Sequence, residues 1–184
     1  MVQAHIRKAV DADIQAISTL AMSSFGTSEG PEIVQLIGDL LVDVTARPVL
    51  SLVAIVDGRV VGHVLFSTVR LKPPGQDVSA ALLAPLAVHP ECQSQGIGSQ
   101  LVAAGIEQLS DAGVDLVFVL GHPAYYPRFG FFEAGIKGFE APYPIPEKNA
   151  AAWMMRELHP GVIGSTRGQV TCADALADPK YWRE

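Results

Sequence analysis

One stretch in the middle of the chain constrains the fold most, because it joins an apolar strand to a helix through a glycine-rich loop. The apolar run 78–88 ends in a turn, the spacing Gln93-x-x-Gly96-x-Gly98 follows, and helical periodicity starts at Ile97. Backbone N–H groups converge in such a loop, and glycines without a Cβ atom let a ligand oxygen approach them. The helix dipole adds about half a positive charge there, so the loop is a predicted diphosphate site.

The glycine spacing on its own is weakly specific. A dinucleotide-binding loop has a third glycine, and a nucleotide triphosphatase loop has a lysine after the last glycine. This loop has neither, so both of those readings are distant alternatives. The remaining alternative is an ordinary strand-to-helix connection that binds no ligand. In that case the glycines only allow the backbone conformations that the turn requires.

The rest of the chain reads as alternating strands and helices in one domain. Asp57-Gly58 predicts a hairpin turn, and Pro85 predicts a bulge or splay inside its strand because proline cannot donate a ladder hydrogen bond. The chain from His159 on reads as loop. Strands are predicted at 4–10, 50–56, 60–69, 78–88, 116–120 and, as a strand or a short helix, 151–158; helices are predicted from Asp11, at 32–42 after a loop with Gly26 and Pro31, and at 97–112. This order predicts an α/β or α+β fold, with helices flanking a mixed sheet.

Composition narrows the class of function. The 184 residues are 49% hydrophobic and 17% charged, which fits a single globular domain with a large core. A net charge of −6 argues against nucleic acid as a partner. Cys92 and Cys172 belong to no metal-binding spacing, and no run of about 20 apolar residues is present for a membrane helix. With no basic-then-apolar leader at the start, we expect a cytoplasmic protein without a metal.

The loop and its surroundings resemble the GNAT superfamily of N-acetyltransferases, whose acyl-CoA-binding motif is Q/R-x-x-G-x-G/A. Further family-like segments follow in chain order and cover most of 5–132. They are His5-Ile6-Arg7 with Asp11, the hairpin Val53–Phe66, Leu86-Ala87-Val88-His89-Pro90, and Tyr126-Pro127-Arg128-Phe129-Gly130-Phe131 for the element Y-x-x-x-G-F. The run from Leu120 to Phe131 is also similar to an LGxPxYYxRFGF run in one bacterial branch of predicted N-acetyltransferases.

The resemblance implies a mostly antiparallel sheet that splays at the CoA-binding strand, and a single acyltransferase domain over 1–184. The part from 133 to 184 is expected to complete the sheet and the acceptor side. Acetyl-CoA is the implied co-substrate. The backbone of Leu86, Ala87 and Val88 would pair with the pantetheine arm. The pyrophosphate would be held by Gln93, Ser94, Gln95, Gly96, Ile97, Gly98 and Ser99.

The resemblance also implies a general acid, the tyrosine of Y-x-x-x-G-F, which is Tyr126 here. A phenol with a pKa of about 10 can protonate a leaving thiolate. The alternative is that Tyr126 only packs, and Tyr125 could exchange roles with it. Many family members carry a glutamate on the strand before the loop, but 80–86 has no carboxylate. Glu29, Glu32, His122 or a bound water are the alternatives for the general base.

The predicted activity is direct transfer of an acetyl group from acetyl-CoA to a primary amine, on a small molecule or a protein. Cys92 is not expected to act as a nucleophile, since no histidine is arranged to activate it. A non-catalytic acyl-CoA-binding regulator is the main alternative, and an O-acyl or longer-chain transferase is another. No nucleic acid or membrane partner is expected; a homodimer through the C-terminal strand would follow a family habit.

Overall fold

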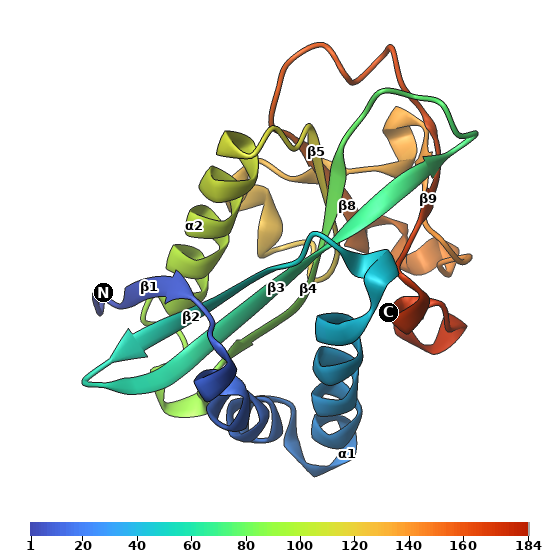
Figure 1. Ribbon diagram of the computed structural model, residues 1–184. Coiled ribbons are helices and arrows are strands. Elements are labelled where there is room, and N and C mark those ends of the chain that lie inside the picture. The colour runs from blue at the N-terminus through green and yellow to red at the C-terminus, as the bar shows by residue number, and fades with distance from the viewer. Residues whose placement is uncertain (184) are drawn as a thin grey trace.

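An open sheet with one long helix on each face forms the frame of the protein (Figure 1). The computed structural model describes residues 1–183. The helices are α1 (Ile14–Val42) and α2 (Ile97–Asp111). The strands are β1 (His5–Lys8), β2 (Leu50–Val56), β3 (Arg59–Lys72), β4 (Ala80–Val88), β5 (Leu116–Leu120), β6 (Phe132–Glu133), β7 (Phe139–Glu140), β8 (Trp153–Glu157) and β9 (Gly168–Thr171).

The sheet runs in the order β1-β2-β3-β4-β5-β8-β6, with β9 joining β3 to β7. Among the described strands, only the β4–β5 and β7–β9 pairs are parallel. The predicted mixed, mostly antiparallel sheet is therefore confirmed. Apolar side chains alternate between its faces, so one core cluster lies under α1 and a second under α2.

The β2–β3 hairpin forms where Asp57-Gly58 predicted it. Both turn residues have positive φ angles, 48° and 74°, which match the right-handed twist of the paired strands. β2 has its predicted bounds, but β3 extends past the predicted end at residue 69. The extension pairs with β9, from Arg70 opposite Thr171 to Lys72 opposite Gln169. The last three residues of the strand therefore depend on a partner strand about 100 residues away in the chain. The pattern of apolar residues in the strand itself does not reveal this partner.

β4 parts from its neighbour halfway along its length. It pairs with β5 only from Ala80 to Leu82, whereas its pairing with β3 continues to Val88. The β3–β4 register shifts across Pro85, because Val64 faces Leu86 while Phe66 faces Leu83. The predicted bulge at the proline is confirmed, and no described strand pairs with the β5-facing edge of β4 beyond Leu82.

Helix α1 contains a single break where a loop was predicted. Gly26 alone takes a non-helical conformation, with φ 73° and ψ −175°, and the helix continues through Pro31 to Val42. One residue with positive φ redirects the chain by itself, so no longer loop is needed. The predicted loop is therefore wrong in length, although its glycine is the turning point.

The C-terminal third is more ordered than its sequence predicted. The segment 151–158 contains β8 rather than a helix. The prediction of loop beyond His159 missed β9, whose Val170 is fully buried in the α1-side core. The chain then ends in two short 3₁₀ turns packed near the second half of α1 (Figure 1). None of the helices within 1–183 is long and apolar enough to cross a membrane.

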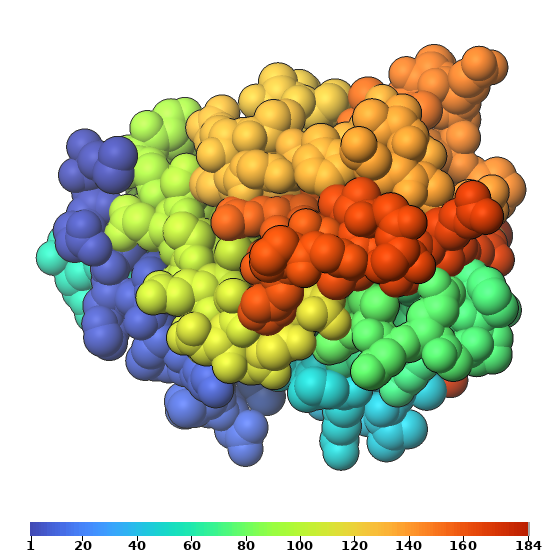
Figure 2. Space-filling view, turned by 90° about the horizontal axis from the view of Figure 1, so that it is seen from above, coloured from blue at the N-terminus to red at the C-terminus, as the bar shows by residue number. Residues whose placement is uncertain are grey.

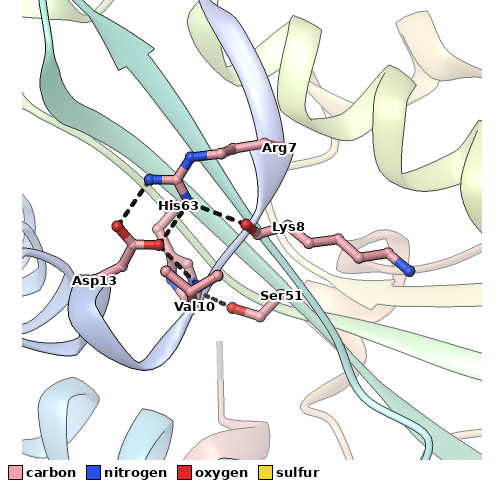
Figure 3. A network of polar contacts seen from close by, with 6 residues as sticks. All are labelled: Arg7, Lys8, Val10, Asp13, Ser51 and His63. Atoms are coloured by element: carbon pink, nitrogen blue, oxygen red, sulfur yellow. Dashed lines mark hydrogen bonds and ion pairs between the residues drawn. The ribbon is translucent and has the colours of Figure 1, made fainter.

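A polar network fixes the start of α1 beside β1 (Figure 3). The Arg7 guanidinium donates two hydrogen bonds to Asp13, at 2.6 and 2.9 Å, and the backbone N–H of Val10 donates a third at 2.8 Å. These donors favour the charged carboxylate and hold the pKa of Asp13 at about 2. The predicted strand 4–10 ends early, at Lys8, because Val10 is already the N-cap residue of the 3₁₀ turn Asp11–Asp13 that leads into α1.

Candidate active site

A cavity of about 630 Å³ opens at the N-terminus of α2, next to the unpaired edge of β4. The loop after β4 and the first turn of α2 form one wall, and Tyr125 and Arg128 form the other. Nine of the ten residues predicted to bind the cofactor line this cavity: Leu86, Val88, Gln93, Ser94, Gln95, Gly96, Ile97, Gly98 and Ser99. Ala87 does not, because alternation along β4 turns its buried side chain to the opposite face from Leu86 and Val88.

The loop presents three backbone donors to the cavity. Gly96 caps α2 with a φ of 88°, and no described side chain accepts a hydrogen bond at this cap. The first helical hydrogen bond runs from the N–H of Gln100 to the carbonyl of Gly96, at 3.1 Å. The N–H groups of Ile97, Gly98 and Ser99 therefore have no acceptor within the helix. Together with the helix dipole they form an anion site of the predicted kind.

The side-chain amides of Gln93 and Gln95 form hydrogen bonds with backbone carbonyls in and next to the loop, and so stabilise its conformation. Gln93 donates its side-chain amide to the Val88 carbonyl at 3.1 Å, and Ser24 from α1 donates to the same oxygen at 3.1 Å. Gln95 donates to the carbonyl of Glu91 at 2.9 Å. The carbonyl of Val88, which was predicted to pair with the pantetheine arm, thus already has two protein donors.

The N-terminal segment lies along the same loop, which the sequence did not predict. The N–H of Val2 donates to the Gln95 carbonyl at 3.1 Å. Gln100 donates to the Val2 carbonyl at 2.7 Å and accepts from the N–H of Ala4 at 3.0 Å. Figure 2 shows the blue N-terminal residues against the yellow-green surface of the loop and α2. Such a contact, between residues about 96 apart, has no local sequence signal.

The two adjacent tyrosines occupy different places. Tyr125 is half-buried in the cavity wall, and its hydroxyl would lie 2.6 Å from a Cβ atom on Gly98. Burial raises the pKa of Tyr125, while a hydrogen bond with Ser99 and the charge of Arg128 oppose that rise. The phenol of Tyr125 therefore lies at the loop end of the cavity.

Tyr126 lies behind this wall. It is 8% exposed and packs in edge contacts with the rings of Tyr125 and Phe131. Its ring also covers Gly121, just past the end of β5, where an added Cβ would come within 2.5 Å of it. Tyr126 is therefore placed at the split between β4 and β5 rather than at the glycine loop.

The carboxylates predicted as general bases lie away from the cavity. Glu29 and Glu32 are both exposed on α1, and the Glu32 carboxylate lies 2.7 Å from the Nζ atom of Lys180. His122 is exposed, and its Nδ1 accepts a hydrogen bond from the N–H of Ala124 at 3.2 Å. None of these three lines the cavity, so the structure does not bring the predicted bases to the predicted cofactor site.

Three further residues line the cavity: Met1, whose side chain lies over Gly96, Cys92 and Arg128. Cys92 is half-buried beside the loop, and Arg128 comes from the 3₁₀ turn Tyr126–Phe129. Sequence reasoning quoted Arg128 only as an unassigned position of Y-x-x-x-G-F. Within residues 1–183, no group of three or more His, Cys, Asp or Glu side chains is placed to hold a metal ion.

Comparison with known proteins agrees with this geometry. The model of the GNAT acetyltransferase domain matches residues 5–134. The Escherichia coli K12 N-acetyltransferase YjhQ is 46% identical over 172 residues, which cover 92% of this chain and 91% of YjhQ. The N-acetyltransferase YhbS of the same strain is 34% identical over 166 residues, covering 90% of this chain and 93% of YhbS.

Solved structures extend the likeness to the whole fold. The crystal structure of E. coli YhbS in complex with CoA has a TM-score of 0.84 at 31% identity, covering 97% of this chain and 94% of YhbS. A GNAT family acetyltransferase from Brucella melitensis in complex with acetyl-CoA has a TM-score of 0.73 at 29% identity, covering 95% of this chain and 98% of that one. The chain therefore belongs to the GNAT family of acetyltransferases.

Proposed function

We propose that this acetyltransferase transfers an acetyl group from acetyl-CoA to a primary amine by direct attack of the amine on the thioester. The observation that carries the proposal is the cavity at the N-terminus of α2, where three helical N–H groups lack an intrahelical acceptor. CoA in the YhbS structure and acetyl-CoA in the Brucella structure support the identity of the donor.

The donor is expected to run from the loop toward the split in the sheet. Its pyrophosphate would accept hydrogen bonds from the N–H groups of Ile97, Gly98 and Ser99. Its pantetheine arm would lie along β4 beyond Leu82, where β5 no longer pairs with that strand. The thioester would then lie near the C-terminal end of β5, beside Tyr126.

The reaction forms one bond and breaks one. The nitrogen of the neutral amine attacks the carbonyl carbon, a C–N bond forms, the C–S bond breaks, and the sulfur leaves as a thiolate. We propose that Tyr126 protonates this thiolate, since it lies at the split, whereas Tyr125 lies at the loop end of the cavity. A water molecule takes the proton of the amine, since Glu29 and Glu32 lie outside the cavity.

The acceptor is proposed to be an amine on a small molecule or a protein, encountered in the cytoplasm. The net charge of −6 favours a cationic acceptor over nucleic acid. Residues 133–184 supply β8, β9 and their connections, and we propose that they belong to the same domain and border the acceptor. A homodimer through the C-terminal strand would follow the habit of the family.

Release of free thiol from acetyl-CoA tests this function. Purified protein is mixed with acetyl-CoA and a panel of amines, and the thiol is followed with a chromogenic disulfide. We expect release that depends on both an amine and the protein, and that falls in Tyr126→Phe. Binding of acetyl-CoA with no thiol release for any amine would instead favour the non-catalytic binding module. That alternative is supported by the cavity lining, which contains no carboxylate among residues 1–183.

A further inference from the structure

We propose that Arg128 binds a phosphate group of the CoA donor and supplies the full positive charge that the glycine loop does not carry. The inference rests on the proposed use of acetyl-CoA and adds a specificity residue to that site. It stands on the position of Arg128 across the cavity from the loop, on the way its guanidinium is held, and on the charges around it.

The cavity has an unbalanced charge. Of the described side chains that line it, Arg128 is the only cation, and none is a carboxylate. The opposite wall offers backbone N–H groups and the partial charge of one helix end, which amounts to about half a unit. For the protein as a whole the net charge is −6, so a positive cavity is a local feature and not a reflection of composition.

Aromatic stacking holds the guanidinium in place. Its central carbon lies 4.6 Å from the centre of the Tyr125 ring, and the Tyr125 hydroxyl is in turn engaged by Ser99 on the opposite wall. Within residues 1–183, Arg128 forms no ion pair and no hydrogen bond, whereas Arg7 is paired with Asp13. Glu107, Asp111 and Glu157 line a neighbouring hollow with Arg128, but none of them forms an ion pair with it, so its planar fork stays available.

Phosphate is the group that matches such an arginine. A guanidinium donates two parallel hydrogen bonds to phosphate oxygens and keeps its charge at every working pH. CoA carries phosphate at two places, the pyrophosphate and the ribose 3′-phosphate. Gln93, the first residue of the loop motif, is neutral and donates to the Val88 carbonyl, so it does not supply the missing charge. Arg128 is the described side chain placed to do so.

Titration calorimetry with CoA compares the wild type with Arg128→Gln and Arg128→Lys. The loss of a charge-assisted hydrogen bond predicts a Kd about ten- to a hundred-fold higher for the glutamine variant. The lysine variant should fall between, because an ammonium keeps the charge but not the fork. Arg59→Gln, which removes an exposed arginine at the β2–β3 hairpin, is the matched control and should bind like the wild type.

Kinetics and salt separate this role from a structural one. The KM for acetyl-CoA should rise in Arg128→Gln while kcat stays within about two-fold, because the loss falls on binding that is equal in the ground and transition states. The Kd of the wild type should rise more steeply with salt than that of Arg128→Gln. The unfolding temperatures of the two proteins should agree, since Arg128 is exposed.

A second ligand identifies the phosphate. If the gap between wild type and Arg128→Gln disappears with 3′-dephospho-CoA, Arg128 binds the 3′-phosphate; if the gap persists, it binds the pyrophosphate. Equal Kd values of the two proteins for CoA would overturn the inference while leaving the proposed function intact. A folded wild type that binds no CoA would overturn both.

Discussion

Tyr125 and Tyr126 are neighbours in the chain, but they face different ends of the proposed donor. Tyr125 is tied to Ser99 and Arg128 at the loop, and Tyr126 covers Gly121 at the end of β5. We expect Tyr126→Phe to lower kcat by about a hundred- to ten-thousand-fold, the usual range for loss of a general acid, with little change in the Kd for acetyl-CoA. Steady-state kinetics and calorimetry measure the two quantities.

Tyr125→Phe serves as the matched control for that change, since it removes the neighbouring hydroxyl and keeps the ring under Arg128. Its kcat should stay within about three-fold of the wild type if its phenol does not enter the chemical step. A larger fall in kcat for Tyr125→Phe than for Tyr126→Phe would exchange the two roles.

His63 is a second residue whose surroundings predict a measurable effect. Its side chain is fully buried on β3, and its Nε2 atom lies 2.9 Å from the Oγ atom of Ser51 (Figure 3). Burial lowers its pKa from 6.5 to about 4. The unfolded chain therefore binds a proton that the folded chain refuses between these values, so stability falls as the pH drops from about 6.5 toward 4.

We expect the wild type to lose about 1 kcal/mol of unfolding free energy between about pH 7 and about pH 5.5 through this residue. Urea unfolding at the two pH values measures the loss. His63→Gln removes the titrating group, so its own stability should change less over the same interval. An equal pH dependence in both proteins would show that His63 does not titrate as its burial implies.

At the scale of elements, α2 lies close to the sheet because a glycine faces it. A Cβ atom on Gly105 would fall 2.3 Å from the ring of Phe66 on β3, a distance that neither side can accept without moving. Gly105→Ala should therefore destabilise the protein by about 1–3 kcal/mol, despite the better helix propensity of alanine. Chemical denaturation gives the free energy of unfolding.

Gly38 in α1 provides the matched control. It is exposed and a Cβ there meets nothing within 4 Å, so Gly38→Ala should stabilise by up to about 1 kcal/mol. If Gly105→Ala were as stable as Gly38→Ala, the close packing of α2 on β3 would be wrong.

The elements also show where sequence reasoning succeeds. The bounds of β2 and β5 follow from apolar runs that end at turn residues, and the splay of β4 follows from Pro85, which lacks an N–H. These strand bounds and the bulge depend on residues that are close together in the sequence, so the sequence pattern is sufficient to predict them. β9 escaped prediction because only four residues form it and its partners are distant in sequence.

The same division applies to the candidate site. The loop 93–99 could be predicted because its residues are contiguous and each contributes backbone. Arg128 could not be assigned, since its role depends on a tertiary approach to the loop. The roles of Glu29, Glu32 and Tyr126 stay predictions, and so does the narrower likeness of the Leu120–Phe131 run to one bacterial branch.

At the scale of the whole molecule, the C-terminal third is joined to the family-like part at several points. β9 pairs with β3, the buried ring of Trp182 lies in the α1-side core, and Lys180 pairs with Glu32. These contacts predict a single cooperative unfolding transition for the whole chain.

Two optical probes test this single transition, because they report on different parts. Both tryptophans, Trp153 and Trp182, belong to the C-terminal third, whereas both long helices precede residue 112. Tryptophan fluorescence and far-UV circular dichroism should give coincident denaturation curves. A fluorescence transition at lower denaturant than the helix transition would separate 133–184 as a less stable unit.

Binding of acetyl-CoA in the cavity at the start of α2 is the property on which the proposed function depends most. Titration calorimetry of the wild type, Ser94→Glu and Ser94→Gln tests it, because the two variants have similar size and share the same strained position, with φ 60°, but differ in charge. We expect a wild-type Kd of roughly 1 µM to 1 mM, comparable to enzyme KM values. Binding should be retained in Ser94→Gln and weakened by at least about ten-fold in Ser94→Glu by repulsion of the phosphates. No binding by the folded wild type, or equal binding by both variants, would contradict the account.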